Sequence, residues 1–124
     1  MNGMRDSNAK HIDFGFLQGC IKDNPKALPS DLDMILERKG RFLIGEWKRT
    51  GEKISRGQQI LLNKLASNGF FVVIIIEGYS YDGNTEVNNI YYVKKGTLEK
   101  SKYSGVNGLK KLINRWYDWA DGFI

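Results

Sequence analysis

Hydrophobic and polar residues alternate along this chain with two periods, one typical of strands and one typical of helices. A run of β-branched and aromatic residues bounded by Gly69 and Gly78 predicts a central strand over about 70–77 that is buried on both faces. Helical spacing of apolar residues, after a capping signal and before Asn-Gly, predicts a helix over about 55–67. The same spacing predicts a C-terminal helix over about 108–121.

An antiparallel β-hairpin is predicted over about 31–48, with its turn at Lys39-Gly40. Counting outward from that turn pairs residues across the hairpin: Asp33 with Glu46, and Asp31 with Lys48. Directly opposed residues share one face and lie about 4.5–5.5 Å apart at Cβ. A four-residue loop keeps this pairing, whereas a three-residue loop with a bulge shifts it by one residue. The loop therefore decides whether the two carboxylates meet.

The succession of elements predicts the topology of the sheet. A right-handed strand–helix–strand connection makes the strand over 70–77 parallel to the strand that carries Glu46 and Lys48. Residues 87–93 are predicted to form a further strand at the sheet edge, and residues 13–22 a short amphipathic helix. We therefore expect a mixed α/β sheet flanked by helices, with residues 1–124 forming a single domain.

Charge is concentrated around the hairpin. The chain carries a net charge of +5, and seven basic residues against two acidic ones lie between Arg38 and Arg56. This distribution favours a phosphate backbone as the partner, with Arg49, Lys53 and Arg56 as candidate phosphate contacts.

Other compositional features limit the compartment and the chemistry. A single cysteine, Cys20, cannot form an internal disulfide, and a single histidine, His11, excludes a histidine-based zinc site or triad. The longest apolar run is far shorter than the roughly 20 residues that span a bilayer, and no signal-peptide core is visible. We expect an intracellular, cytoplasmic protein with no membrane partner.

The polar face of the hairpin has the residues of a metal-dependent hydrolase. Asp33 and Glu46 on adjacent strands offer the hard oxygen ligands that Mg²⁺ or Mn²⁺ prefers. A bound divalent ion can neutralise a phosphodiester and activate water, and Lys48 on the same face can orient that water or offset charge in the transition state. These three residues are the predicted catalytic set.

The stretch from Asp33 to Lys48 resembles the PD-(D/E)XK nuclease superfamily, with Glu46-Trp47-Lys48 as its E-x-K motif. Its layout is similar to that of archaeal Holliday-junction resolvases, and the sequence Gly-Glu-Trp-Lys-Arg followed by Ile-Ser-Arg-Gly-Gln resembles small bacteriophage nuclease-like proteins. The similarity covers about residues 28–78. It implies a restriction-endonuclease-like core and a Mg²⁺- or Mn²⁺-dependent endodeoxyribonuclease that leaves 5′-phosphate and 3′-hydroxyl ends, with selectivity for DNA structure.

The resemblance also assigns supporting residues. Gln58 matches a glutamine that several branches place on the helix after the E-x-K strand, although its spacing from Ser55 equally predicts a capping box. Either Asp31 or Asp33 matches the family's aspartate; we favour Asp33, and expect Asp31 to support the site or to form a surface ion pair with Lys48. Asp13 is a candidate substitute for the glutamate that many members carry on their first helix.

An alternative reading belongs to the binding class. The same fold would then be a catalytically silent nucleic-acid-binding or accessory module, although the intact acids and lysine favour the enzyme. A domain of this size makes a small footprint on DNA, so cutting two strands would require a C2 homodimer. The C-terminal helix and an edge at Tyr91 are the candidate dimer surfaces.

Overall fold

The structure is a computed structural model that describes residues 13–122, and the chain divides between Asp31 and Leu32 into two compact units. In the first unit, η1 (Phe14–Leu17) is a single 3-10 turn, whose N-terminus is capped by the Asp13 carboxylate accepting from the Gly15 N–H at 2.8 Å. The predicted helix over 13–22 is therefore wrong. Gly19 has a φ of +85°, a left-handed conformation that cannot continue a helix.

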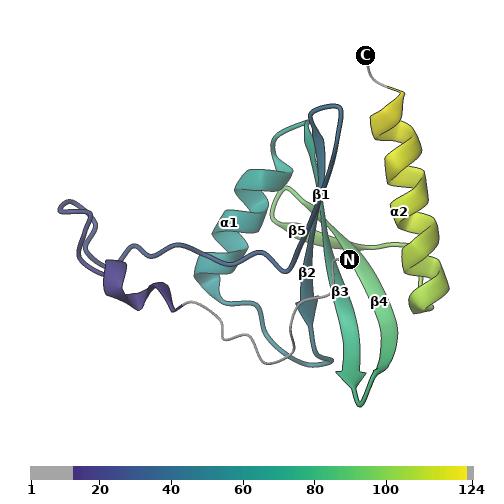
Figure 1. The fold of residues 1–124 in the computed structure, drawn as a ribbon, viewed down its shortest axis with the longest axis horizontal. Helices are drawn as coiled ribbons and strands as arrows, with labels where there is room; N and C mark the ends of the chain where they lie inside the picture. The colour runs from purple at the N-terminus through teal and green to yellow at the C-terminus, as the bar shows by residue number, and fades with distance from the viewer. Residues whose placement is uncertain (1–12, 123–124) are drawn as a thin grey trace. The chain divides into compact units, whose positions relative to one another are not determined.

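The second unit contains one mixed sheet of five strands in the order β1-β2-β3-β4-β5 (Figure 1). Its strands are β1 (Met34–Arg38), β2 (Arg41–Lys48), β3 (Phe71–Tyr81), β4 (Asn84–Lys94) and β5 (Thr97–Lys100). β2 and β3 are parallel, as the crossover connection predicts, and all other neighbours are antiparallel. The mixed α/β sheet is confirmed, and so is a central strand whose residues 73–76 are buried.

The hairpin has the predicted register. Met34 pairs with Gly45 and Arg38 with Arg41, so the turn consists of Lys39 and Gly40 alone. Both turn residues have positive φ, 51° and 79°, as a type I′ turn requires. This two-residue turn keeps the pairing that brings Asp33 opposite Glu46.

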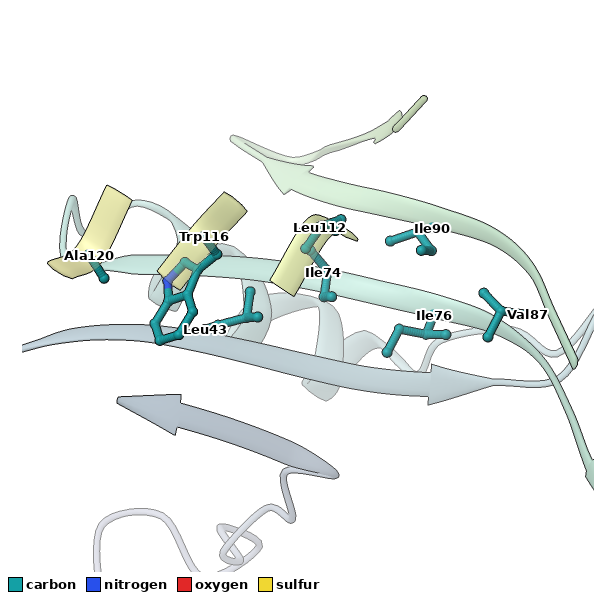
Figure 2. Close-up of a cluster of buried hydrophobic side chains, with 8 residues drawn as sticks. All are labelled: Leu43, Ile74, Ile76, Val87, Ile90, Leu112, Trp116 and Ala120. Carbon is teal, nitrogen blue, oxygen red and sulfur yellow. The ribbon is translucent and has the colours of Figure 1, made fainter. Parts of the chain in front are cut away.

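Two helices cover opposite faces of the sheet (Figure 1). α1 (Arg56–Ala66) packs Leu62 on one face, against a cluster that includes Ile44 and Ile75. α2 (Gly105–Asp121) packs on the other face, and Figure 2 shows its side chains directed at those of β2, β3 and β4. That second cluster contains Leu43, Ile74, Ile76, Val87, Ile90, Leu112, Trp116 and Ala120. Within residues 13–122, no helix is long and apolar enough to cross a membrane.

The edge of the sheet differs from the prediction. β4 is an inner strand, because the chain turns at Lys95-Gly96 and returns as β5, which pairs Tyr91 with Lys100. The expectation of an edge strand over 87–93 is therefore wrong for residues 91–93, which pair with β5, and Tyr91 offers no free edge for a dimer. β1 and β5 are the two outer strands.

An ion pair joins the β1–β2 hairpin to the end of α2. Arg38 Nη2 lies 2.5 Å from Asp121 Oδ1, and Lys39 Nζ donates to the Asp121 carbonyl oxygen at 2.7 Å. The hydrogen bond from Arg38 holds the pKa of the Asp121 carboxyl below its usual 3.8. The ionised Asp121 carboxylate therefore stabilises the folded state at neutral pH.

Replacing Asp121 with asparagine is expected to lower the melting temperature at pH 7, because the contact with Arg38 loses its charge. A lowered folded-state pKa stabilises the protein above the unfolded pKa and ceases to do so as pH falls through the folded value. The difference between Asp121→Asn and the parent should thus shrink below pH 3.8. Thermal melts across this range test it, with exposed Asp118→Asn on the same helix as control. A difference that persists unchanged at pH 2 would contradict the assignment.

Candidate active site

The polar residues of β2 point toward the face covered by α1. Side chains alternate along a strand, and Ile44 packs in the α1 cluster, so Glu46 and Lys48 share its face. Their neighbours Gly45 and Trp47 point to the α2 face. The E-x-K spacing therefore places both side chains on the α1 face at the end of β2, and Glu46 contacts Gln58 in the first turn of α1.

Glu46 is the buried polar residue of the second unit, with 5% of its surface exposed. Its Oε1 accepts a hydrogen bond of 2.5 Å from Gln58 Nε2, on α1. Its Oε2 is buried and has no hydrogen-bond partner within the described part of the chain. A buried carboxylate oxygen without a partner is costly, and a cation is a natural means of satisfying it.

Asp33 lies one residue before β1, and the register of the hairpin brings it opposite Glu46. Its Oδ2 accepts a hydrogen bond of 2.8 Å from the backbone N–H of Trp47, which sits between the two residues of the E-x-K motif. This bond ties the start of β1 to the end of β2. The Asp33 side chain remains exposed, so the site is open to solvent on this side.

The electrostatics of Glu46 reflect its crowded position. Burial raises the pKa of its carboxyl above the usual 4.5, and the nearby Asp33 carboxylate raises it further. The Lys48 ammonium and the N–H groups of Asp33 and Gln58 act in the opposite direction, with smaller effects. A divalent cation bound between the buried Glu46 carboxylate and the exposed Asp33 carboxylate would relieve their mutual repulsion.

Gln58 contributes to the helix start and to the site. The Ser55 hydroxyl accepts from the Gln58 backbone N–H at 3.2 Å, which caps α1. The Gln58 side chain, instead of returning to the Ser55 backbone as in a full capping box, donates to Glu46. The sequence left two roles open for the Gln58 side chain, closing a capping box or contacting the active site, and the structure shows the contact with Glu46.

Two residues beside Lys48, Glu77 and Asn89, were not among the site residues predicted from the sequence. Lys48 is the register partner of Glu77 on β3, and Glu77 Oε1 accepts a 2.8 Å hydrogen bond from Asn89 Nδ2 on β4. Alternation from Ile75 turns Glu77 to the α1 face, the face of Glu46. The sequence offered one signal for Glu77: it is a charged residue two positions after Ile75, so it lies on the same face of the predicted buried strand.

The remaining predicted residues lie around or outside this group. Arg49, Lys53 and Arg56 are exposed on the segment between β2 and the first turn of α1. Asp13 and Asp31 belong to the first unit, so their roles at the site stay predictions. Among residues 13–122 there is no group of three or more histidine, cysteine, aspartate or glutamate side chains that could hold a metal. Asp33 and Glu46 alone offer two carboxylates. Two carboxylates suit Mg²⁺, whose remaining ligands are usually water and substrate oxygens.

The chain matches no protein-family model, no curated protein and no solved structure. The case for a function therefore depends on the site geometry and on the sequence motif.

Proposed function

We propose that this chain is a metal-dependent endodeoxyribonuclease of the PD-(D/E)XK type. The observation that supports the proposal best is the buried Glu46 carboxylate, whose unpartnered Oε2 lies on the face of Lys48 and opposite Asp33. A buried carboxylate with one oxygen unsatisfied and a raised pKa is costly to the fold, and such residues are concentrated at functional sites.

In this proposal Asp33 and Glu46 hold Mg²⁺ or Mn²⁺. When bound, the ion would supply positive charge at the scissile phosphate and would lower the pKa of a water molecule, so that hydroxide is available as the nucleophile near neutral pH. Gln58 orients the Glu46 carboxylate by its hydrogen bond to Oε1, which leaves Oε2 for the ion. The Trp47 N–H fixes the Asp33 carboxylate through Oδ2.

Lys48 acts on the substrate side. Its ammonium orients the attacking water and offsets charge that develops on the phosphate oxygens in the transition state. Glu77, the register partner of Lys48 on β3, is held by a hydrogen bond from Asn89 and places a negative charge beside the lysine. Hydrolysis leaves a 5′-phosphate and a 3′-hydroxyl.

The basic segment after β2 binds the DNA backbone. Arg49, Lys53 and Arg56 are exposed and follow the catalytic strand directly, so phosphates beside the scissile bond meet positive charge there. Cutting both strands of a duplex requires two sites, which a C2 dimer would provide through the exposed side chains of α2, among them Tyr117 and Trp119.

Cleavage of end-labelled single-stranded, duplex and branched DNA tests the proposal. We expect cleavage with Mg²⁺ or Mn²⁺ and none with EDTA. Asp33→Asn and Lys48→Gln should each lose about a hundredfold or more, because the first removes a ligand of the ion and the second removes positive charge that acts on the transition state. Lys100→Gln, an exposed change on β5, is the matched control and should cleave like the parent.

Two results would overturn the proposal. Asp33→Asn and Lys48→Gln that cleave as fast as the parent would remove both residues from the chemistry. A parent that binds DNA in a salt-sensitive way and cleaves none of these substrates would instead be the catalytically silent binding module.

A further inference from the structure

The hairpin of β3 and β4 continues beyond the core as a ribbon made of residues 78–87 (Figure 1). A β-bulge between Glu77 and Gly78 separates this ribbon from the rest of the sheet. Every residue from Tyr79 to Glu86 is exposed, and the ribbon closes at an Asp82-Gly83 turn in which both residues have positive φ. No helix of the second unit buries this ribbon.

Two tyrosines lie along one face of the ribbon. Gly78 pairs with Val87, whose side chain is buried in the α2 cluster, so Tyr79 and Tyr81 point to the opposite face. That is the face of Glu77, and across β2 the face of Lys48 and Glu46. The row therefore runs from the candidate active site outward along β3.

These tyrosine side chains are unusually open for aromatic residues in a strand. Tyr79 is 40% exposed and Tyr81 is 56% exposed. Their cross-strand partners on the same face are Glu86 and Asn84, neither of which covers a ring. Exposed aromatic rings in a row beside a candidate nuclease site form a surface on which bases can stack.

We propose that Tyr79 and Tyr81 form a stacking platform for unpaired bases of a single-stranded DNA segment that leads into the active site. Two residues along a strand span about 6.6 Å, which is about twice the 3.4 Å rise between stacked bases, so one base fits between successive rings. Single-stranded binding proteins combine such rings with a basic track for the backbone.

The charges near the ribbon favour single strands over duplex. The ribbon carries Asp82 and Glu86 and no basic residue, so it repels a phosphate backbone laid along it. Base faces become available for stacking only when a strand is unpaired, because a duplex buries them in its own stack. Phosphates of the same strand instead reach the basic segment, which a Thr50 Oγ1 to Asn88 Oδ1 hydrogen bond of 3.4 Å holds at the base of the ribbon.

This inference rests on the proposed nuclease function, whose substrate class it narrows. The scissile bond would lie within or next to a single-stranded segment, as in an overhang, a flap or a branch. The binding test is made without metal, so its outcome does not depend on catalysis.

The experiment measures anisotropy of a labelled oligothymidine, and of a thymidine–adenine duplex of the same length, with EDTA present. We expect Tyr79→Val and Tyr81→Val each to weaken single-strand binding about tenfold, because each removes one stacking surface. Duplex binding should stay within about twofold of the parent. Tyr79→Phe and Tyr81→Phe keep the rings and should bind like the parent, and valine suits a strand, so the variants retain the fold.

The outcomes separate the two proposals. Valine variants that bind oligothymidine like the parent, or that lose duplex binding equally, overturn the platform, as do phenylalanine variants that lose as much affinity as valine. A parent whose single-strand binding depends on the rings, but which cleaves no DNA with Mg²⁺ or Mn²⁺, refutes the nuclease and keeps the platform. A parent that cleaves, with binding insensitive to the rings, gives the reverse result.

Discussion

Replacing Glu46 with glutamine is expected to abolish DNA cleavage and, at the same time, to raise the melting temperature of the metal-free protein. Glu46 is 5% exposed, its Oε2 has no hydrogen-bond partner among residues 13–122, and the Asp33 carboxylate lies opposite. A neutral amide of the same shape removes the buried charge, which we expect to stabilise the fold by about 1 kcal/mol, or about 4–8 °C for a unit of this size. A residue kept at the expense of stability is typical of an active site.

The pH dependence of this gain has a definite sign. Because burial raises the pKa of the Glu46 carboxyl in the folded state, stability falls as pH rises from the unfolded value of 4.5 through the folded value. At neutral pH the parent has therefore lost the stability that ionisation of the buried Glu46 costs, whereas Glu46→Gln, which does not ionise, has not. Well below pH 4.5 the acid is neutral in both states, so the two proteins should melt at nearly the same temperature.

Melting curves with and without Mg²⁺ or Mn²⁺ give the second half of the test. Metal that binds only the folded parent raises its melting temperature, and Glu46→Gln should lose that rise. Glu99→Gln, an exposed change on β5, is the matched control and should retain both cleavage and the metal-induced rise. A Glu46→Gln protein that melts below the parent without metal, yet still cleaves DNA, would make Glu46 a structural residue.

The geometry of the hairpin could be predicted because a single local feature determines it. Lys39-Gly40 forms a two-residue type I′ turn, and once the turn is known every cross-strand pair follows by counting. The same holds for the parallel pairing of β2 and β3, which the handedness of strand–helix–strand connections determines. Patterns that depend on local backbone chemistry and chain connectivity are visible in sequence.

What could not be predicted depends on tertiary contacts. The choice of the Gln58 side chain between Ser55 and Glu46 is decided by how closely α1 packs on β2, which spacing alone does not reveal. Glu77 joins the site only because β3 lies in register beside β2. The apolar spacing of residues 13–22 is that of a helix, but Gly19 takes a left-handed conformation, so the segment forms only the short turn η1.

The bulge that separates the site from the ribbon could not be seen in sequence either, although a glycine marks it. Gly78 follows Glu77, and the shift in pairing from Glu77–Asn89 to Gly78–Val87 leaves Asn88 as the extra residue on β4. Bulges are frequent next to active sites, where they redirect a strand. Here the bulged residue also receives the hydrogen bond that anchors the basic segment.

Replacing Gly78 with alanine is expected to destabilise the protein by about 3 kcal/mol or more, a large share of the roughly 5–15 kcal/mol by which ordinary domains are stable. A Cβ at this position would lie 2.0 Å from the carbonyl oxygen of Glu86 and 3.1 Å from the Cα of Val87. These are backbone atoms of a paired strand, so relief requires β3 and β4 to separate at the bulge, which breaks the ladder and moves Glu77 and the ribbon together. Urea unfolding, or the soluble yield if folding fails, measures the effect.

Gly45→Ala is the matched comparison, because it places the same methyl group in the adjacent strand of the same sheet. Its closest contact, at 2.8 Å, is the Cε of Met34, the end of a flexible side chain that can move aside. We expect a loss of no more than about 1–2 kcal/mol there, and none for Gly57→Ala, where a Cβ meets nothing within 4 Å. If Gly78→Ala unfolds at the same urea concentration as Gly45→Ala, the two strands do not approach as closely at the bulge as described. The order of the three variants therefore tests the backbone contact that joins the candidate active site to the tyrosine ribbon.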